Sequence, residues 1–293
     1  MKNLSTGLIA AVILATGILI SCKKTNDDTV FSSYTQYVNP KLGKYIIYNL
    51  DSTVTASFGA YFVKKSYLVK DSIVAVITDG MGRESYKIFR YQYDSAQRRW
   101  NSTNTFLLTP TPTSLELVEN NFRYIKLVNP IEDDKSWQGN RYVNQSPFYP
   151  NTFFPDWTYY YRDVAQPKKI GAFNFANTVT VVQYDSTDNR PFYPKGYNFY
   201  DRSYEIYADS IGLVYKDIMS WEYQAFTSLV GCKLVKPKTG GGFDTTNVNC
   251  NLASTNCDSL ARVPNYRIIS CDTVITQAYY NGYGVKQTIV SHN

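Results

Sequence analysis

The chain has 293 residues, with 30 Lys and Arg against 24 Asp and Glu and with 27 tyrosines, but only one histidine. The charges are scattered and form no basic stripe of the kind that nucleic-acid binding needs, so no nucleic-acid partner is expected. The one imidazole belongs to His292, the second-last residue, which argues against Ser-His-Asp, Cys-His and histidine-rich zinc sites. We therefore predict a protein that is not an enzyme, with no catalytic residue, cofactor or metal site.

The N-terminus has the pattern of a bacterial export signal. Lys2 precedes an apolar run from Leu8 to Ile20, which is too short to span a bilayer comfortably and is typical of a signal-peptide core. The run ends in Leu19-Ile20-Ser21-Cys22, which resembles the lipobox of bacterial lipoproteins, whose cysteine is lipidated and becomes the first residue. We expect residues 1–21 to be a signal peptide and Cys22 to carry the lipid anchor. The alternative is an ordinary cleaved signal with a chance cysteine at its end.

The residues that follow the cysteine predict how the protein is held. Residues 22–33 are polar beyond Cys22 and have no periodicity, which is typical of a flexible tether. Each buried methylene of an acyl chain adds about 0.8 kcal/mol of membrane affinity, so the several chains of a lipoprotein bind almost irreversibly. Lys23 gives no acidic signal for retention in the inner membrane. We therefore expect a cell-envelope protein on the outer membrane, and its periplasmic or surface face stays open.

The folded part, residues 34–293, is predicted to be a single β domain. Runs rich in Tyr, Ile and Val, which favour strands, lie between Gly, Asp and Ser turns. Asp79-Gly80-Met81-Gly82 looks like a hairpin turn between two of them. The first predicted strands cover 43–58, 64–79 and 84–94.

The later part of the domain continues the strand pattern. Residues 115–130 predict two strands around an Asn120-Asn121 turn, with a short helix over 113–119 as the alternative. Apolar and polar residues alternate most clearly in 203–224. This alternation places Lys216, Ser220 and Glu222 together on a solvated face of the sheet. No long helical period and no internal repeat appears. The predicted fold is mainly β, with one strongly curved antiparallel sheet that is partly closed as a half-barrel. Further strands are expected over 176–186, 203–224 and 284–293.

Residues 231–275 interrupt the sheet and carry four cysteines. The stretch contains Lys-Pro-Lys-Thr-Gly-Gly-Gly and looks like an insertion between two neighbouring strands. In an oxidising envelope an even number of cysteines indicates disulfides, and four cysteines allow three pairings. We favour the nested pairing, which would staple an insertion that has little core of its own; a zinc site of four cysteines is the alternative, although no CxxC pair occurs. The nested pairs are Cys232–Cys271 and Cys250–Cys257.

An aromatic segment interrupts the sheet over residues 138–163. Contiguous exposed aromatic side chains generally form a binding site, here for a glycan or an envelope protein. The alternative is a proline-kinked segment that packs over the open mouth of the sheet. The candidate residues are Phe148, Tyr149, Phe153, Phe154, Trp157, Tyr159, Tyr160 and Tyr161.

Two clusters of acidic residues are better explained as turns than as functional sites. Adjacent carboxylates at 132–134 could do acid–base work on a glycan, but neighbours on a turn more often face water. The DSTDNR stretch at 185–190 lacks the ligand spacing of a calcium loop.

A repeated Asp-Ser or Asp-Thr pair, followed by a small, aliphatic or Thr residue, resembles the O-glycosylation site of exported Bacteroidota proteins. Asp-Ser also opens turns, so the pattern has a structural alternative. We predict modification at some of these positions. The candidates are Ser52, Ser72, Ser95, Ser186, Ser210, Thr245, Ser259 and Thr273.

Four sequence segments together resemble those of an uncharacterised group of Bacteroidota outer-membrane lipoproteins. They are GKYIIYNLDSTV, NNFRYIKLVNPI with SWQGN, SIGLVYKDIMSWEYQ and KQTIVSHN. The resemblance implies no activity and no functional residue. The strand layout is also similar to the half-barrel sheets of lipid and lipoprotein carriers. We therefore expect a membrane-anchored, non-enzymatic binding or assembly module, with an envelope protein, glycan or lipid as partner. The alternative is a carrier that holds a lipid or another apolar ligand on the concave face.

Overall fold

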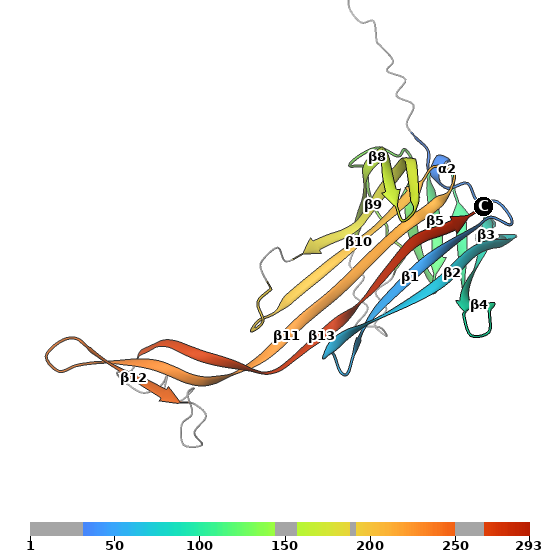
Figure 1. Cartoon of the computed structure of the whole chain (residues 1–293). Coiled ribbons are helices and arrows are strands. Elements are labelled where there is room, and N and C mark those ends of the chain that lie inside the picture. The colour runs from blue at the N-terminus through green and yellow to red at the C-terminus, as the bar shows by residue number, and fades with distance from the viewer. Residues whose placement is uncertain (1–31, 144–156, 188–191, 250–266) are drawn as a thin grey trace, which may run out of the picture. The chain divides into compact units, whose positions relative to one another are not determined.

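The computed structural model describes residues 32–143, 157–187, 192–249 and 267–293, which belong to one compact unit, Ser32–Asn293. The described residues are mainly β, with 73% of them in strands, and these strands build one antiparallel sheet that is nearly closed like a barrel (Figure 1). The elements are α2 (Tyr34–Tyr37), β1 (Tyr45–Ala56), β2 (Tyr61–Thr78), β3 (Glu84–Asp94), β4 (Arg99–Pro110), β5 (Ser114–Glu119), β6 (Phe122–Val128), β7 (Ser136–Gln138), β8 (Thr158–Ile170), β9 (Phe173–Thr187), β10 (Asn198–Ala208), β11 (Gly212–Pro237), β12 (Phe243–Asn249) and β13 (Arg267–His292).

Most strands pair with the strand that follows them in the chain. The order is β6-β5-β4-β3-β2-β1-β13-β11-β10-β9-β8-β7, and β12 pairs with β11 off this path. The last strand, β13, inserts between β1 and β11, so both ends of the domain meet in the middle of the sheet. This antiparallel order lets short turns join most neighbours, as in barrels built from hairpins.

The two ends of the strand order approach each other and nearly close the sheet. The backbone N–H of Ile125, in β6, donates to the carbonyl of Gly139 at 2.8 Å, just beyond β7. Trp137 Nε1 donates to the carbonyl of Ile125, also at 2.8 Å. The Tyr161 hydroxyl of β8 accepts from the N–H of Val128 and donates to its carbonyl. The predicted curved antiparallel sheet is confirmed, and it is closed further than the half-barrel that the sequence predicted.

Most of the predicted strands are present. The ranges 43–58, 64–79 and 84–94 correspond to β1, β2 and β3, and Gly82 has a φ of 76° in the turn that was predicted between the last two. Asn120 and Asn121 both have positive φ, 52° and 66°, which suits the tight turn of a β5–β6 hairpin. The alternative of a helix over 113–119 is therefore wrong.

The single strand predicted over 203–224 is two strands. β10 ends at Ala208 and β11 starts at Gly212, with Ser210 in a turn at a φ of 60°. The predicted solvated face is wrong at Lys216, which is 9% exposed and points into the interior. Alternation in the sequence cannot distinguish solvent from the polar interior of a closed sheet, because both alternate with apolar positions.

The predicted insertion extends two neighbouring strands. Beyond Tyr223, β11 pairs only with β13 and β12, and β13 before Tyr283 pairs only with β11. We call residues 224–249 and 267–282 the ribbon; Figure 1 shows it leaving the rest of the sheet. Cys232 and Cys271 are Cα partners across it. Cys232 is 4% exposed, whereas Cys250 and Cys257 lie outside the described residues.

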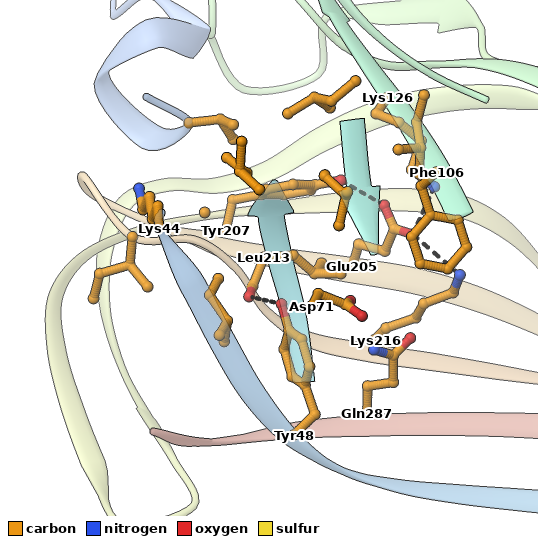
Figure 2. Close-up of a pocket in the computed structure, with 18 of the residues that line it drawn as sticks. Lys44, Tyr48, Asp71, Phe106, Lys126, Glu205, Tyr207, Leu213, Lys216 and Gln287 are labelled. Carbon is orange, nitrogen blue, oxygen red and sulfur yellow. Dashed lines mark hydrogen bonds and ion pairs between the residues drawn. The ribbon is translucent and has the colours of Figure 1, made fainter. Parts of the chain in front are cut away.

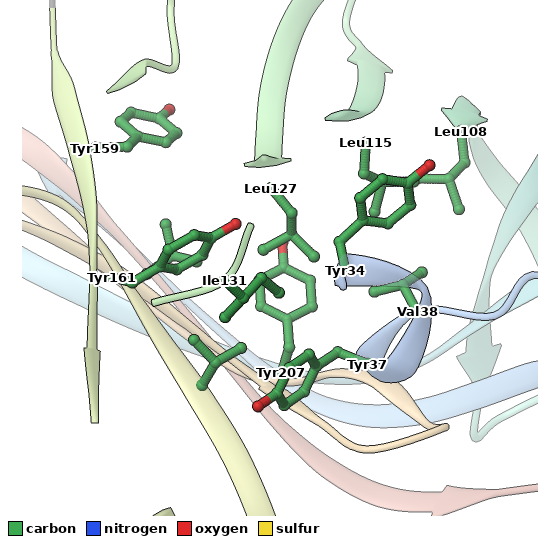
Figure 3. Close-up of a cluster of buried hydrophobic side chains, with 12 residues drawn as sticks. Tyr34, Tyr37, Val38, Leu108, Leu115, Leu127, Ile131, Tyr159, Tyr161 and Tyr207 are labelled. Carbon is green, nitrogen blue, oxygen red and sulfur yellow. The ribbon is translucent and has the colours of Figure 1, made fainter. Parts of the chain in front are cut away.

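The domain has two clusters of buried apolar side chains. One includes Leu127, Tyr161 and Tyr207 and receives Tyr34 and Tyr37 from α2 (Figure 3). Hydrogen bonds fix α2 there: the Tyr34 hydroxyl donates to a backbone carbonyl of the β4–β5 turn, and the Tyr37 hydroxyl donates to an amide oxygen at 3.1 Å. The second cluster is built from Tyr48, Val69, Ile170, Phe175, Ile206, Ala208, Val214 and Ile289.

Candidate functional site

A cavity of about 140 Å³ lies inside the nearly closed sheet (Figure 2). Most strands of the barrel contribute to its wall, because antiparallel neighbours present alternate residues to the same face. Its apolar wall includes Ile46, Ile73, Ile88, Phe106, Leu117 and Leu213. Its polar wall includes Tyr48, Asp71, Arg90, Glu119, Lys126, Glu205, Tyr207, Lys216 and Gln287.

Three polar residues form a row across adjacent strands. Glu205 of β10 is the Cα partner of Lys216 of β11, and Lys216 is the partner of Gln287 of β13. Directly opposed residues of antiparallel strands have neighbouring side chains on one face. All three side chains therefore reach the cavity together, and Figure 2 shows them in its polar half.

Glu205 is the centre of a buried ion-pair network. Lys126 Nζ, from β6, donates to Glu205 Oε1 at 2.6 Å, and the Tyr207 hydroxyl donates to Oε2 at 2.7 Å. Lys216 Nζ is 3.8 Å from Glu205 Oε1 and 3.7 Å from Glu119 Oε2. Glu205 is 1% exposed, so its carboxylate depends on these partners instead of water.

Three charges of the network are stabilised in their ionised forms, whereas burial lowers the pKa of Lys126. Burial alone would raise the pKa of Glu205, but Lys126 and Lys216 outweigh it and lower that pKa. Lys216 lowers the pKa of Glu119, and burial opposes this only in part. Burial disfavours the ammonium form of Lys216, yet Glu119 and Glu205 together raise its pKa. The interior thus stabilises the ionised forms of Glu119, Glu205 and Lys216.

A second ion pair lines the cavity and is complete in itself. Arg90 of β3 and Asp71 of β2 are Cα partners, and the guanidinium donates to both carboxylate oxygens, at 2.7 and 2.6 Å. Such bidentate ion pairs are among the strongest charge-assisted hydrogen bonds. The Tyr48 hydroxyl is also used, because it donates to the carbonyl of Leu213 at 2.8 Å. In its bonds to Asp71, Arg90 uses Nε and Nη2, and its guanidinium lies over the Phe106 ring at 4.9 Å.

Two donors in the wall lack a hydrogen-bond partner. Gln287 is 2% exposed, and its Nε2 makes no hydrogen bond. Lys216 Nζ has only its two carboxylate contacts, both beyond 3.5 Å and so longer than hydrogen bonds. An unpaired buried amide costs about 1–3 kcal/mol, so a donor of this kind beside a cavity points to an occupant.

The aromatic residues predicted as a binding surface lie in different environments. Tyr159 and Tyr161 are 2% and 0% exposed and belong to the core, so for these two the predicted surface is wrong. Trp157 is half-buried and stacks on Tyr184 with ring centroids 5.0 Å apart, and Tyr160 is also half-buried. Packing against the rest of the sheet explains why these aromatics are present here. The remaining candidates, Phe148, Tyr149, Phe153 and Phe154, lie outside the described residues.

The candidate glycosylation sites are in several environments. Ser95 and Ser210 are exposed and lie in turns, where Asp94 and Asp209 bond to nearby groups as the structural alternative requires. Thr245 is exposed on β12. The other described candidates lie within strands and are half-buried, and Ser259 lies outside the described residues, as does Cys22. The half-buried ones are Ser52, Ser72, Ser186 and Thr273.

The acidic turn at 132–134 is structural. Asp133 Oδ1 accepts from the N–H of Val164 at 3.0 Å, and Glu132 is 3.8 Å from Lys135. Within the described ranges, no group of three potential metal-ligating side chains comes together. Nor does any described helix have the length and apolar character to cross a membrane.

The cavity residues were not among the candidates taken from the sequence. A signal does exist for two of them, because Lys126 and Glu205 are single charges inside apolar runs, Tyr-Ile-Lys-Leu-Val and Tyr-Glu-Ile-Tyr. A charge in such a run faces either solvent or a buried partner, and only the sheet closure decides which. Comparison with known proteins adds no template. No family model, curated protein or solved structure matches the chain.

Proposed function

We propose that the protein is a lipid-anchored protein of the cell envelope that binds a small ligand inside its sheet without catalysing a reaction. The observation that carries the proposal is the cavity, with an apolar wall, a fully paired charge network and the unpartnered amide of Gln287. Concave sites with mostly apolar walls and a few convergent polar groups are the usual form of ligand sites. The lipobox-like sequence before Cys22 supports the anchor and the outer-membrane location.

The size of the cavity limits the ligand. A dry cavity of about 150 Å³ takes up benzene, and sites for drug-sized ligands are about 300–1,000 Å³. A cavity of about 140 Å³ is therefore matched to a molecule, or to part of one, about as large as a single ring. This favours a small-ligand binding module over the alternative of a carrier for complete acyl chains.

Native mass spectrometry of residues 23–293 tests the proposal. These residues include the whole compact unit, and the protein is purified from an envelope-bearing host without detergent. We expect a discrete extra mass that is lost on gentle activation. A Leu213→Phe variant fills the cavity and should lose this mass, whereas Leu42→Phe, at an exposed position outside the wall, should keep it. A bare mass for the wild-type protein, together with no effect of Leu213→Phe on any binding, would overturn the proposal.

Assembly with an envelope protein is a second candidate function, favoured by the ribbon. Phe226, Phe243 and Val274 are 47%, 69% and 46% exposed there, and β12 leaves one strand edge without a described neighbour. Exposed apolar groups beside an open edge are typical of strand-addition interfaces. A photo-crosslinking residue at position 243 should capture one defined envelope protein in cells, and the same residue at 42 should not. Equal capture at both positions would count against assembly through the ribbon.

The disulfides and the O-glycans also stay proposals. Paired Cα atoms on antiparallel strands are about 4.5–5.5 Å apart, which is within the range that a disulfide spans. The register of Cys232 with Cys271 therefore supports the nested pairing. Intact mass decides both points: two disulfides lower the mass by about 4 Da from the reduced value, and glycans add discrete increments. A fully reduced mass would contradict the stapled ribbon.

A further inference from the structure

We infer that the ligand is an uncharged molecule about one ring in size, whose carbonyl, ether or hydroxyl oxygen accepts hydrogen bonds from Gln287 Nε2 and Lys216 Nζ. The inference rests on the proposed binding function and gives it a ligand class. It depends on three features of the wall: which charges are present, which donors are already used, and where the two unused donors lie.

The ion pairs of the wall are balanced, which disfavours a charged ligand beside them. Each of three carboxylates has a cationic neighbour within 4 Å, and each of three cations has a carboxylate. Lys44, a fourth cation of the lining, instead donates to the backbone carbonyls of Asn39 and Ser210. An added ion would bring a net charge into a site removed from water, and such a charge is expensive unless it is paired. The three carboxylates are Asp71, Glu119 and Glu205, and the three cations are Arg90, Lys126 and Lys216.

The unpaired buried polar atom of the wall is a donor. Arg90, Lys126 and Tyr207 each donate to a carboxylate at 2.7 Å or less. Gln287 Nε2 and Lys216 Nζ have no hydrogen bond of their own. The Glu119 carboxylate also accepts none, but its side chain is 24% exposed and can bond to water. A ligand that pairs with the buried donor must bring an acceptor, and an oxygen atom is the common one.

The two unused donors lie next to each other. Lys216 and Gln287 are Cα partners on β11 and β13, so their side chains share one face of the sheet and reach the same end of the cavity (Figure 2). The apolar wall, with Phe106 and Leu213, surrounds the rest of the space. An apolar ring that carries one oxygen atom fits this arrangement. The oxygen accepts hydrogen bonds from Lys216 and Gln287, and the ring packs against the apolar wall.

Four single-ring probes test the inference on residues 23–293. Cyclohexanone carries an acceptor, methylcyclohexane is its apolar match, and cyclohexylammonium is its cationic match; benzoate serves as the anion. We expect cyclohexanone to bind about tenfold more tightly than methylcyclohexane, since a hydrogen bond to a buried donor contributes about 1 kcal/mol and one to a charged donor more. Both charged probes should bind more weakly than cyclohexanone. Ligand-observed NMR titrations measure the four dissociation constants.

Two variants assign the preference to the donor pair. Gln287→Met keeps the side-chain volume but removes the amide, and it should reduce the preference for cyclohexanone over methylcyclohexane, with Lys216 Nζ left as the second donor. Gln183→Met is the matched control: Gln183 is also 2% exposed with an unpartnered Nε2, but it does not line the cavity, so its replacement should leave the ratio unchanged. If Gln287→Met does not fold, the ranking of the probes on the wild-type protein still decides.

The outcomes separate the ligand class from the binding function. Tighter binding of methylcyclohexane or of a charged probe, abolished by Leu213→Phe, would overturn the ligand class and leave the cavity as a binding site. An unchanged ratio in Gln287→Met would also overturn the class. Binding of no probe at all, or binding that Leu213→Phe does not affect, would mean that the cavity holds water only and would overturn both proposals.

Discussion

The strands β11 and β13 run through two regions of the molecule that differ in what surrounds them. In the barrel, Val214 and Ile289 are 0% and 2% exposed, whereas in the ribbon Phe226 and Val274 are 47% and 46% exposed. The ladder between the two strands continues through both regions, from Tyr215 to Val235. Strand pairing is thus nearly the same in both, and burial is not. Because apolar burial is the dominant favourable term in folding, stability should be concentrated in the barrel.

The two regions also treat charge differently. Lys126 is buried in the barrel and bonded to Glu205, whereas Lys233 is exposed in the ribbon. A buried charge depends on its partner, because removal of one member leaves the other without water or counter-charge. An exposed lysine has water as its partner. Matched substitutions in the two regions should therefore have very different effects on stability.

The largest effect is expected at the buried ion pair. Lys126→Met leaves Glu205 with only the Tyr207 hydroxyl and the more distant Lys216, so it should lower the free energy of unfolding by about 3–5 kcal/mol. Lys233→Met, in the ribbon, should change it by less than about 0.5 kcal/mol. Urea unfolding of residues 23–293 measures both values.

The double variant Lys126→Met/Glu205→Met gives the control for the ion pair. It removes both charges, and apolar replacement of a whole buried pair is often neutral, so it should recover most of the lost stability. If the double variant is as unstable as Lys126→Met alone, the loss comes from the missing ion pair and not from the unpaired carboxylate of Glu205.

Two isoleucines of β13 compare apolar burial within one strand. Ile289 is 2% exposed in the second core cluster, and Ile275 is 37% exposed in the ribbon. Ile289→Ala should lower the free energy of unfolding by about 2–5 kcal/mol, the usual range for a buried side chain that leaves a cavity. Ile275→Ala should lower it by less than about 1 kcal/mol. Similar losses at both positions would show that something covers the ribbon in solution.

The junction between barrel and ribbon can be tested at a glycine. A Cβ at Gly282 would lie 2.3 Å from the carbonyl oxygen of Ser220 and 2.5 Å from the Cα of Trp221, so the backbone would have to shift. Gly282→Ala should lower the free energy of unfolding by about 1–3 kcal/mol, as overpacking does. Gly80→Ala, where a Cβ meets nothing within 4 Å, is the control. Hydrogen exchange should locate the loss at the base of the ribbon, and a loss spread evenly over β13 would contradict this account.

Local patterns predicted the strands, and they could not predict what closes the sheet. The ranges of β1, β2 and β3 follow from their Tyr, Ile and Val content and from the turns between them. β4 has the polar run Asn-Ser-Thr-Asn-Thr, and β8 contains Gln-Pro-Lys-Lys before its last residue, so parts of both strands lack the composition of a strand. Their place depends on neighbours that are distant in sequence.

The interior charges were missed for the same reason. Lys216 alternates with apolar residues as a solvated residue would, and its carboxylate partners come from β5 and β10. Glu119 is 97 positions away along the chain (216 minus 119), so no spacing rule links the two. The site is made by closure of the sheet, and its residues become recognisable only when the strand order is known.

The smallest effect is expected from mild acid, and it also separates the two regions. The pKa of Glu119 is lowered by Lys216, and that of Glu205 is lowered because Lys126 and Lys216 outweigh burial. A carboxyl with a lowered folded-state pKa adds stability above the unfolded value, about 4.3 for Glu, and this stability is lost as the pH falls through the folded value. The free energy of unfolding should therefore fall on acidification below about pH 5.

Substitution tests whether these two carboxyls cause the acid effect. Glu119→Gln removes one titrating group and should flatten the pH dependence, although it lowers stability at neutral pH by separating Lys216 from a partner. Glu132→Gln, whose side chain is 41% exposed, should leave the dependence unchanged. Hydrogen exchange at pH 4 should show the loss of protection in the barrel strands and not in the ribbon. An equal loss in the ribbon would mean that acid acts on the whole chain, since no residue of the network lies there.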